Sequence, residues 1–281
     1  MMAKKRPKLN RGEKLVRMPA PPKAQEAALV RFCEFIVRQV FNRWRNNVFS
    51  LTKSEIAKFA DSEAAAKMLT LTDDNWAVEA QKKAAKVKRR ILAQLSDERI
   101  QKTVAEILQK ADLYNKATFY RAVSPVLGID TKNLIKADGA TWEINALINE
   151  TVMWIQSLRD KALQESLEHT LHLMAEGRDL AYIETTYSVL EAKRLRNAST
   201  LARNQLGNFN GLANKIRQQH LGIEEAIWST SGDDTVRPSH ADRDGKRYRL
   251  DEGCYSSVDG EYLYPGLDFN CRCDSYAVIP E

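Results

Sequence analysis

The chain contains 281 residues, of which 43% are hydrophobic and 28% are charged, and its formal net charge is +6. This length allows one sizeable core, or a helical body that carries a smaller module. No window approaches the run of about eighteen apolar residues that a membrane span needs, and the N-terminus lacks the apolar stretch of a secretory signal. The composition therefore excludes a membrane protein and predicts a soluble protein made in the cytoplasm.

Charge is distributed unevenly along the chain. Residues 1–23 carry eight cations and one acidic residue, a net charge of +7, whereas residues 228–281 carry six cations and eleven acidic residues, a net charge of −5. A basic arm of this kind neutralises nucleic-acid phosphates or lies on an acidic protein surface, and a solubilising tail without a partner is the other interpretation. We predict a flexible basic arm over residues 1–23, with these candidate DNA-contacting residues: Lys4, Lys5, Arg6, Lys8, Arg11, Lys14 and Arg17.

Residues 24–222 are predicted to form a helical body. Apolar residues recur at steps of three and four over residues 25–48, which indicates one helix with a buried face. A capping-box pattern from Thr52 to Glu55 predicts a second helix that runs to about residue 68. Residues 75–123 contain no proline or glycine and predict one long helix or two, interrupted near Ser96 and ended at Pro125.

Two further long helices are predicted, over residues 142–175 and 179–220. In the second of them, residues 207–211 (Gly-Asn-Phe-Asn-Gly) concentrate poor helix formers and predict a kink or a break. Connecting loops this sparse favour an elongated helical body over a compact α/β unit.

After Gly222 the sequence becomes rich in turn residues. Short strands are predicted over residues 226–230, 247–250, 261–264 and 274–278. The predicted fold is therefore mainly α, an elongated helical body followed by a small C-terminal α+β module with short antiparallel strands at residues 223–281.

The C-terminal module carries an ordered series of motif residues. A tryptophan precedes an aspartate-rich turn, an Arg-x-x-His step, a glycine-bearing turn, a proline and a closing Cys-Arg-Cys. These residues are Trp228, Asp233, Arg237, His240, Gly245, Pro265, Cys271 and Cys273. Together with the helix just upstream, around Ala198 to Asn204, the series resembles the Mu F-like minor head proteins of bacteriophages over about residues 190–281. One piece would be weak support, but the whole series in the same order is a specific match.

The resemblance implies a virion protein made in the cytoplasm of a bacterial host. Its implied partners are the portal protein and capsid or scaffold proteins, with a role in head morphogenesis and, in some relatives, in DNA packaging or ejection. Some relatives carry further C-terminal toxin or enzyme domains. Because Glu281 follows Cys273 by eight residues, we expect no such extension here.

Four residues of the module have the composition of a Cys3His zinc site: His240, Cys254, Cys271 and Cys273. The spacing is irregular, and Cys254 does not belong to the family motif, so the fourth ligand is the doubtful one. A disulfide from Cys254 to Cys271 or Cys273, and reduced thiols packed in a small core, are the alternatives.

A catalytic alternative uses His240 with nearby aspartates as a metal-dependent nuclease or related phosphodiester enzyme. Such chemistry needs carboxylates that converge with a water-activating group on a metal ion. The sequence contains no nucleophile elbow, phosphate loop or His-Glu-x-x-His helix beside these residues. The favoured interpretation is noncatalytic, in which Arg237 and the aspartates fix a tight turn and His240 packs. A third interpretation, a nonviral DNA-binding protein acting through its basic arm, is disfavoured by the ordered motifs.

Overall fold

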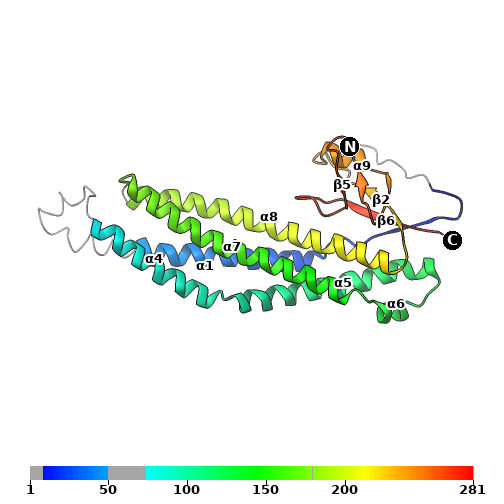
Figure 1. The fold of residues 1–281 in the computed structure, drawn as a ribbon, viewed down its shortest axis with the longest axis horizontal. Helices are drawn as coiled ribbons and strands as arrows, with labels where there is room; N and C mark the ends of the chain where they lie inside the picture. The colour runs from blue at the N-terminus through cyan, green and yellow to red at the C-terminus, as the bar shows by residue number, and fades with distance from the viewer. Residues whose placement is uncertain (1–8, 50–73, 179, 281) are drawn as a thin grey trace, which may run out of the picture. The chain divides into compact units, whose positions relative to one another are not determined.

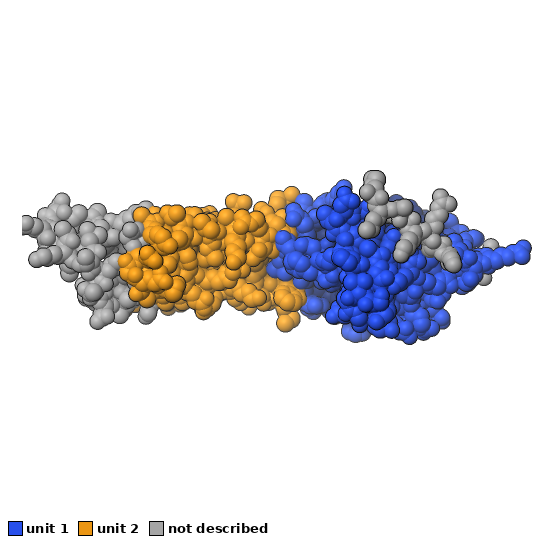
Figure 2. All heavy atoms as spheres, turned by 90° about the horizontal axis from the view of Figure 1, so that it is seen from above, with its two compact units in different colours: residues 1–29, 104–151, 200–281 blue, residues 30–103, 152–199 orange. Residues whose placement is uncertain are grey.

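A computed structural model of the chain describes residues 9–49, 74–178 and 180–280 (Figure 1). The contacts divide the chain into two units (Figure 2). Unit 1 comprises residues 1–29, 104–151 and 200–281, and unit 2 comprises residues 30–103 and 152–199. This division differs from the predicted arm, body and module, because four long helices each contribute one part to each unit.

Unit 2, in its described residues, is helical. It contains parts of α1 (Lys23–Trp44), η1 (Arg45–Phe49), α4 (Asp74–Gln94), α5 (Asp97–Leu127), α7 (Thr141–Ala175) and α8 (Leu180–His220). In its core, Trp44 Nε1 donates to Thr170 Oγ1 at 3.0 Å, and the Tyr187 hydroxyl donates to Ser166 Oγ at 2.8 Å. The rings of Phe41 and Tyr187 pack with centroids 4.8 Å apart. Buried aromatic residues thus have both apolar neighbours and satisfied polar atoms.

Most of the helix predictions are confirmed. The helix expected over residues 25–48 is α1 followed by η1, and the expected interruption near Ser96 separates α4 from α5. The N–H of Arg99 donates to Ser96 Oγ at 3.3 Å, as an N-capping serine should accept. The helix expected to run to residue 68 lies outside the described residues.

The predicted end of α5 is wrong by a few residues. The helix continues through Pro125 to Leu127 and is followed by Gly128, whose φ is +65°. Pro125 lacks the N–H that would bond to the carbonyl four residues earlier, and the helix ends two residues after it. A short helix, α6 (Thr131–Ala137), begins after Asp130, whose Oδ1 accepts from the Lys132 N–H at 2.9 Å.

The predicted break within residues 207–211 is also wrong, because α8 is one helix from Leu180 to His220. A Cβ placed on Gly211 would lie 2.6 Å from the Pro265 carbonyl oxygen. The glycine is therefore required by the close approach of a loop to the helix rather than by a turn. Tertiary packing overrides helix propensity at this point.

A polar network joins three segments of unit 1 beside this contact. Arg217 is 1% exposed and donates to Asp112, to Asn115 and to Asp138, the last from Nε at 3.2 Å. Asn115 also donates to Asn214 Oδ1 at 2.7 Å. Because a buried guanidinium is costly unless it is paired, this network fixes α8 against α5 within the unit.

The sheet of unit 1 has four antiparallel strands in the order β1-β6-β2-β3. These strands are β1 (Lys14–Arg17), β2 (Glu225–Ser229), β3 (Arg247–Arg249) and β6 (Asp274–Ile279), and a separate pair is formed by β4 (Cys254–Tyr255) and β5 (Tyr262–Leu263). One face packs against α5, in a core that includes Phe119, Val123, Trp228 and Ala277. The predicted strands correspond to β2, β3, β5 and β6, so the mainly α fold with a small C-terminal module of antiparallel strands is confirmed.

The prediction of a flexible arm over residues 1–23 requires a correction. Residues Lys14–Arg17 form β1, which pairs with β6 in the register Val16 to Ala277. Val16 and Met18 are 5% and 3% exposed, so burial of apolar side chains and strand pairing hold this part in place. The corrected basic arm is therefore shorter than residues 1–23. No helix among the described residues has the length and apolar character needed to cross a membrane.

We expect Gly211→Ala to destabilise unit 1 by about 1–3 kcal/mol, because the added methyl overlaps the Pro265 carbonyl oxygen. Helix propensity alone predicts the opposite, a gain of about 1 kcal/mol. Gly207→Ala is the matched control, since a Cβ there would meet its nearest neighbour at an ordinary 3.8 Å. Denaturant unfolding of both variants checks this. Equal stabilisation of the two would contradict the packing of the loop on α8.

Candidate functional site

Two motif residues, Trp228 and Gly245, are joined by a backbone hydrogen bond. The Trp228 N–H donates to the Lys246 carbonyl at 3.0 Å, and the Gly245 N–H donates to the Trp228 carbonyl at 2.9 Å. Gly245 has a φ of +75°, which side-chain-bearing residues rarely adopt. The turn after the helix α9 (Pro238–Arg243) is thus held against the end of β2.

His240 lies on α9 and points into the module. It is 4% exposed, and its ring lies edge-on to Trp228 with centroids 5.5 Å apart. Arg237 occupies the N-cap position, and Pro238 follows at the first helical position, where its missing N–H costs nothing. This short helix was not predicted from the sequence, which favoured a tight turn here.

The carboxylate of Asp268 joins α9 to the loop that precedes β6. Its Oδ2 atom contacts His240 Nε2 at 2.9 Å and also accepts from Arg237 Nη1. Arg237 donates in addition to the Phe269 carbonyl. Because Nε2 donates to this carboxylate, Nδ1 is the ring nitrogen left to face the cysteines.

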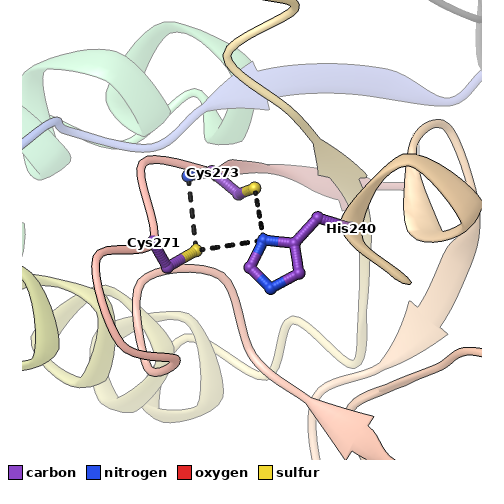
Figure 3. A group of neighbouring side chains, drawn as sticks. All are labelled: His240, Cys271 and Cys273. Atoms are coloured by element: carbon purple, nitrogen blue, oxygen red, sulfur yellow. Dashed lines mark hydrogen bonds between the residues drawn. The ribbon is translucent and has the colours of Figure 1, made fainter. Parts of the chain in front are cut away.

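His240, Cys271 and Cys273 form a group that we name the cysteine–histidine group (Figure 3). His240 Nδ1 lies 3.8 Å from Cys271 Sγ and 3.4 Å from Cys273 Sγ, and the three ligand atoms lie within 4.8 Å of one another. Cys271 Sγ also accepts from the N–H groups of Gly266 at 3.3 Å and Cys273 at 3.4 Å. The loop backbone therefore provides donors for a negatively charged sulfur.

The electrostatics of the group distinguish its two sulfurs. The pKa of the Cys271 thiol is lowered, first by the hydrogen bond with Cys273 and further by His240 and the backbone donors, against the opposing effect of burial. The pKa of Cys273 is raised, because it shares its proton with Cys271 and is buried. The pKa of His240 is raised, chiefly by its contact with Cys271 and also by Asp268, although burial acts in the other direction. Cys271 is therefore the thiolate of the pair.

Cys254, the fourth predicted ligand, does not belong to the cysteine–histidine group. It lies on β4, is 1% exposed, and its carbonyl accepts from Arg243 Nε at 2.8 Å. Burial raises the pKa of its thiol to about 11. All four cysteines are free, so the structure contains no disulfide from Cys254 to Cys271 or Cys273.

Three aspartates of the nuclease alternative have other partners. Asp233 accepts from Thr235 Oγ1 at 2.6 Å and from Arg272 at 2.9 Å. Asp242 accepts from Lys246 Nζ at 2.8 Å, and Asp244 accepts from the Thr230 N–H at 2.8 Å. These contacts stabilise turns, as the noncatalytic interpretation expects for the aspartates. The carboxylate that does contact His240 is that of Asp268.

Two important residues, Asp268 and Arg243, escaped the sequence predictions. Arg243 is fully buried and donates to both carboxylate oxygens of Asp259, at 3.0 and 2.9 Å, and to the Glu261 carbonyl at 2.7 Å. Arg243 follows His240 by three residues, and residues at this spacing lie on one face of a helix. This spacing could have indicated that Arg243 is buried beside His240. No local pattern identifies Asp268.

A hollow of about 700 Å³ in unit 1 lies beside the cysteine–histidine group, which forms part of its lining. Residues of α8 and of the loop before β6 form other parts, with Gly211 and Pro265 among them. Its charged lining residues are mostly cations: Lys23, Arg203, Lys215, Arg237 and Arg272, beside Glu26 and Asp274. Water or a small solute therefore has access to the group.

The predicted DNA-contacting residues are only partly described. Lys4, Lys5, Arg6 and Lys8 lie outside the described residues. Arg11 lies in an exposed turn before β1, whereas Lys14 and Arg17 belong to the strand. Arg17 Nε donates to Asp274 Oδ2 at 3.2 Å, so this cation already has a partner within the sheet.

Residues 161–276 match the family model described as Phage Mu protein F like protein. This part of the chain is similar to that family. A relative from Haemophilus influenzae, described as an uncharacterized protein, is 28% identical over 176 residues, and the match covers 61% of this chain and 38% of the relative. No solved structure matches the chain.

The match confirms the resemblance found in the motif series and extends it. It begins at residue 161, in α7, and continues through α8 to β6. The Mu F-like region therefore includes long helices as well as the motif-bearing module. The family match supports the interpretation of this chain as a phage head-related protein.

We expect Asp259→Asn to destabilise the Mu F-like region by about 2–3 kcal/mol at neutral pH, because it leaves the buried Arg243 guanidinium without a carboxylate. Hydrogen bonds from Arg243 lower the pKa of Asp259 to about 2. This carboxylate therefore stabilises the fold fully above the ordinary aspartate pKa, and its contribution is lost as the pH falls through about 2. The difference between variant and wild type should shrink in acid.

Amide hydrogen exchange of β2 and β6 at several pH values measures this effect locally. Asp251→Asn is the control, since it breaks an exposed ion pair with Arg249. A destabilisation by Asp251→Asn equal to that of Asp259→Asn would contradict the assigned role of Arg243.

Proposed function

We propose that this chain is a noncatalytic minor head protein that acts in phage head morphogenesis and docks on portal or capsid subunits. The observation that carries this proposal is the Mu F-like match over residues 161–276. Within it, the loop before β6 contacts α8 directly, since the Asn270 N–H donates to Asn204 Oδ1 at 2.6 Å. The loop that carries the motif cysteines thus joins α8 to the small module.

The contacts of the motif residues support a noncatalytic role. Trp228 is 1% exposed, and Arg237 is engaged with Asp268 and a backbone carbonyl. Catalytic groups in general converge on a position where a substrate atom can sit. Here the same side chains connect α9, the loop before β6 and the sheet, which is what a binding module requires.

Exposed apolar side chains on the long helices support docking to other proteins. In unit 1, Trp142 on α7 is 71% exposed, and Leu113 and Tyr114 on α5 are 65% and 50% exposed. Aromatic residues are enriched at the centres of protein interfaces, where their burial contributes much of the binding energy. Trp142 is the largest of these three side chains and the sharpest one to test.

The proposal includes contact between the basic N-terminal residues and packaged DNA. The cations at positions 4, 5, 6 and 8 precede β1 and are close together in sequence. A run of this kind binds phosphates by releasing counterions, without reading the base sequence. A DNA contact of this chain would therefore depend on salt.

We expect purified phage particles or proheads to contain this chain at low copy number, and the chain to copurify with the portal protein when the two are coexpressed. Quantitative mass spectrometry of particles and affinity copurification check this. Trp142→Ala should weaken copurification without unfolding the chain, because the side chain is mostly exposed. Glu150→Ala, at an exposed position on the same helix, is the matched control. Absence of the chain from both kinds of particle would refute the proposal.

We expect replacement of Lys4, Lys5, Arg6 and Lys8 by glutamine to weaken binding to duplex DNA and to flatten its salt dependence. Each lost phosphate contact reduces the slope of log affinity against log salt by about 0.9. The control variant replaces four exposed α4 cations, Lys86, Lys88, Arg89 and Arg90, and removes the same charge. An unchanged slope in the first variant, or an equal change in both, would reject a specific DNA contact of the N-terminal residues.

A further inference from the structure

We propose that the cysteine–histidine group binds a zinc ion through His240 Nδ1, Cys271 Sγ and Cys273 Sγ, with a water molecule from the adjoining hollow as the fourth ligand. This inference goes beyond the proposed function, which requires no metal. It rests on the geometry of the three side chains, on the groups that orient them and on their access to solvent.

The spacing of the ligand atoms fits a tetrahedral zinc ion. Zinc bonds of about 2.3 Å to sulfur and 2.05 Å to nitrogen place a nitrogen and a sulfur ligand about 3.6 Å apart. The two distances from His240 Nδ1, 3.8 Å to Cys271 and 3.4 Å to Cys273, lie on either side of that value. Shifts of a few tenths of an ångström would therefore suffice to bind the ion.

The surroundings of the group orient its ligands in the way that zinc sites require. Asp268 accepts from His240 Nε2 at 2.9 Å, an arrangement that fixes the tautomer and leaves Nδ1 as the ligand. The N–H groups of Gly266 and Cys273 donate to Cys271 Sγ and would stabilise a metal-bound thiolate. These donors come from the backbone, so the loop conformation itself prepares the site.

The fourth position is assigned to water because of where Cys254 and the hollow lie. Cys254 is buried on β4 outside the group, whereas His240, Cys271 and Cys273 all line the hollow. Three protein ligands with one solvent position are the ligand set of open zinc sites, which is typical of catalytic zinc, whereas structural zinc usually has four protein ligands. The bound ion would join α9 directly to the loop before β6, in addition to the contacts made by Asp268.

Elemental analysis of the full chain, purified under reducing conditions from zinc-supplemented cells, tests the proposal. We expect about one zinc ion per chain. Cys271→Ala, Cys273→Ala and His240→Ala should lose the metal, whereas Cys254→Ala and Cys33→Ala should retain it. Asp268→Asn should weaken zinc affinity roughly 10- to 100-fold, since it alters the group that orients His240.

A second measurement keeps the test decisive if a ligand variant fails to fold. Cobalt(II) added to the metal-free wild-type chain should produce the intense thiolate charge-transfer bands and tetrahedral visible bands of a site with two sulfur ligands. Cys254→Ala should give the same spectrum. A wild-type chain that binds neither zinc nor cobalt with these bands would overturn the proposal, and loss of metal in Cys254→Ala would overturn the assigned ligand set.

Discussion

The arrangement of the candidate site depends on the carboxylate of Asp268, which connects α9 to the loop before β6. One oxygen accepts from both Arg237 and His240, which lie at the start and in the middle of α9. This contact orients the histidine ring and joins α9 to the loop before β6. Charge-assisted hydrogen bonds are strong and directional, so this carboxylate holds the start of the six-residue helix, while Arg243 holds its end through Asp259 and the Cys254 carbonyl.

The same loop is fixed from its other side by α8. Gly211 allows the Pro265 carbonyl to approach the helix, and Asn204 accepts from the Asn270 N–H. The cysteine–histidine group is thus held between α9 and a loop that is itself packed on a long helix. The Mu F-like match includes α8, the helix against which this loop packs.

Local sequence patterns predicted the long helices of the described residues and four of their six strands, because each is decided by periodicity and turn residues within a short window. The short helices α6 and α9 were not predicted. β1 was missed because four residues near the N-terminus pair with a strand at the other end of the chain, and no local pattern reports that pairing. The role of Gly211 was misread for a related reason, since a helix-breaking residue and a close-packing residue look alike in sequence.

The sequence predicted which residue types form the candidate site, but not which of the cysteines lie beside His240. The motif series singled out His240, Cys271 and Cys273, and composition then suggested Cys254 as well. Only the fold decides which sulfurs converge, because Cys254 and Cys271 are separated by a hairpin and a loop whose path the sequence leaves open. Asp268 could not be predicted for the same reason, because its carboxylate contacts residues that are 28 and 31 positions away in the sequence.

Some of the oppositely charged residues near the two ends of the chain form ion pairs in the folded sheet. Pairing of β1 with β6 brings Arg17 of the basic N-terminal segment to Asp274 of the acidic C-terminal segment. Glu13, the one acidic residue among residues 1–23, pairs instead with Arg247 on β3. Arg17 is therefore engaged in an ion pair inside unit 1. This pairing reduces the number of N-terminal cations that are available to bind DNA. Lys4, Lys5, Arg6 and Lys8 carry that proposal, and a substitution confined to them leaves the residues of β1 unchanged.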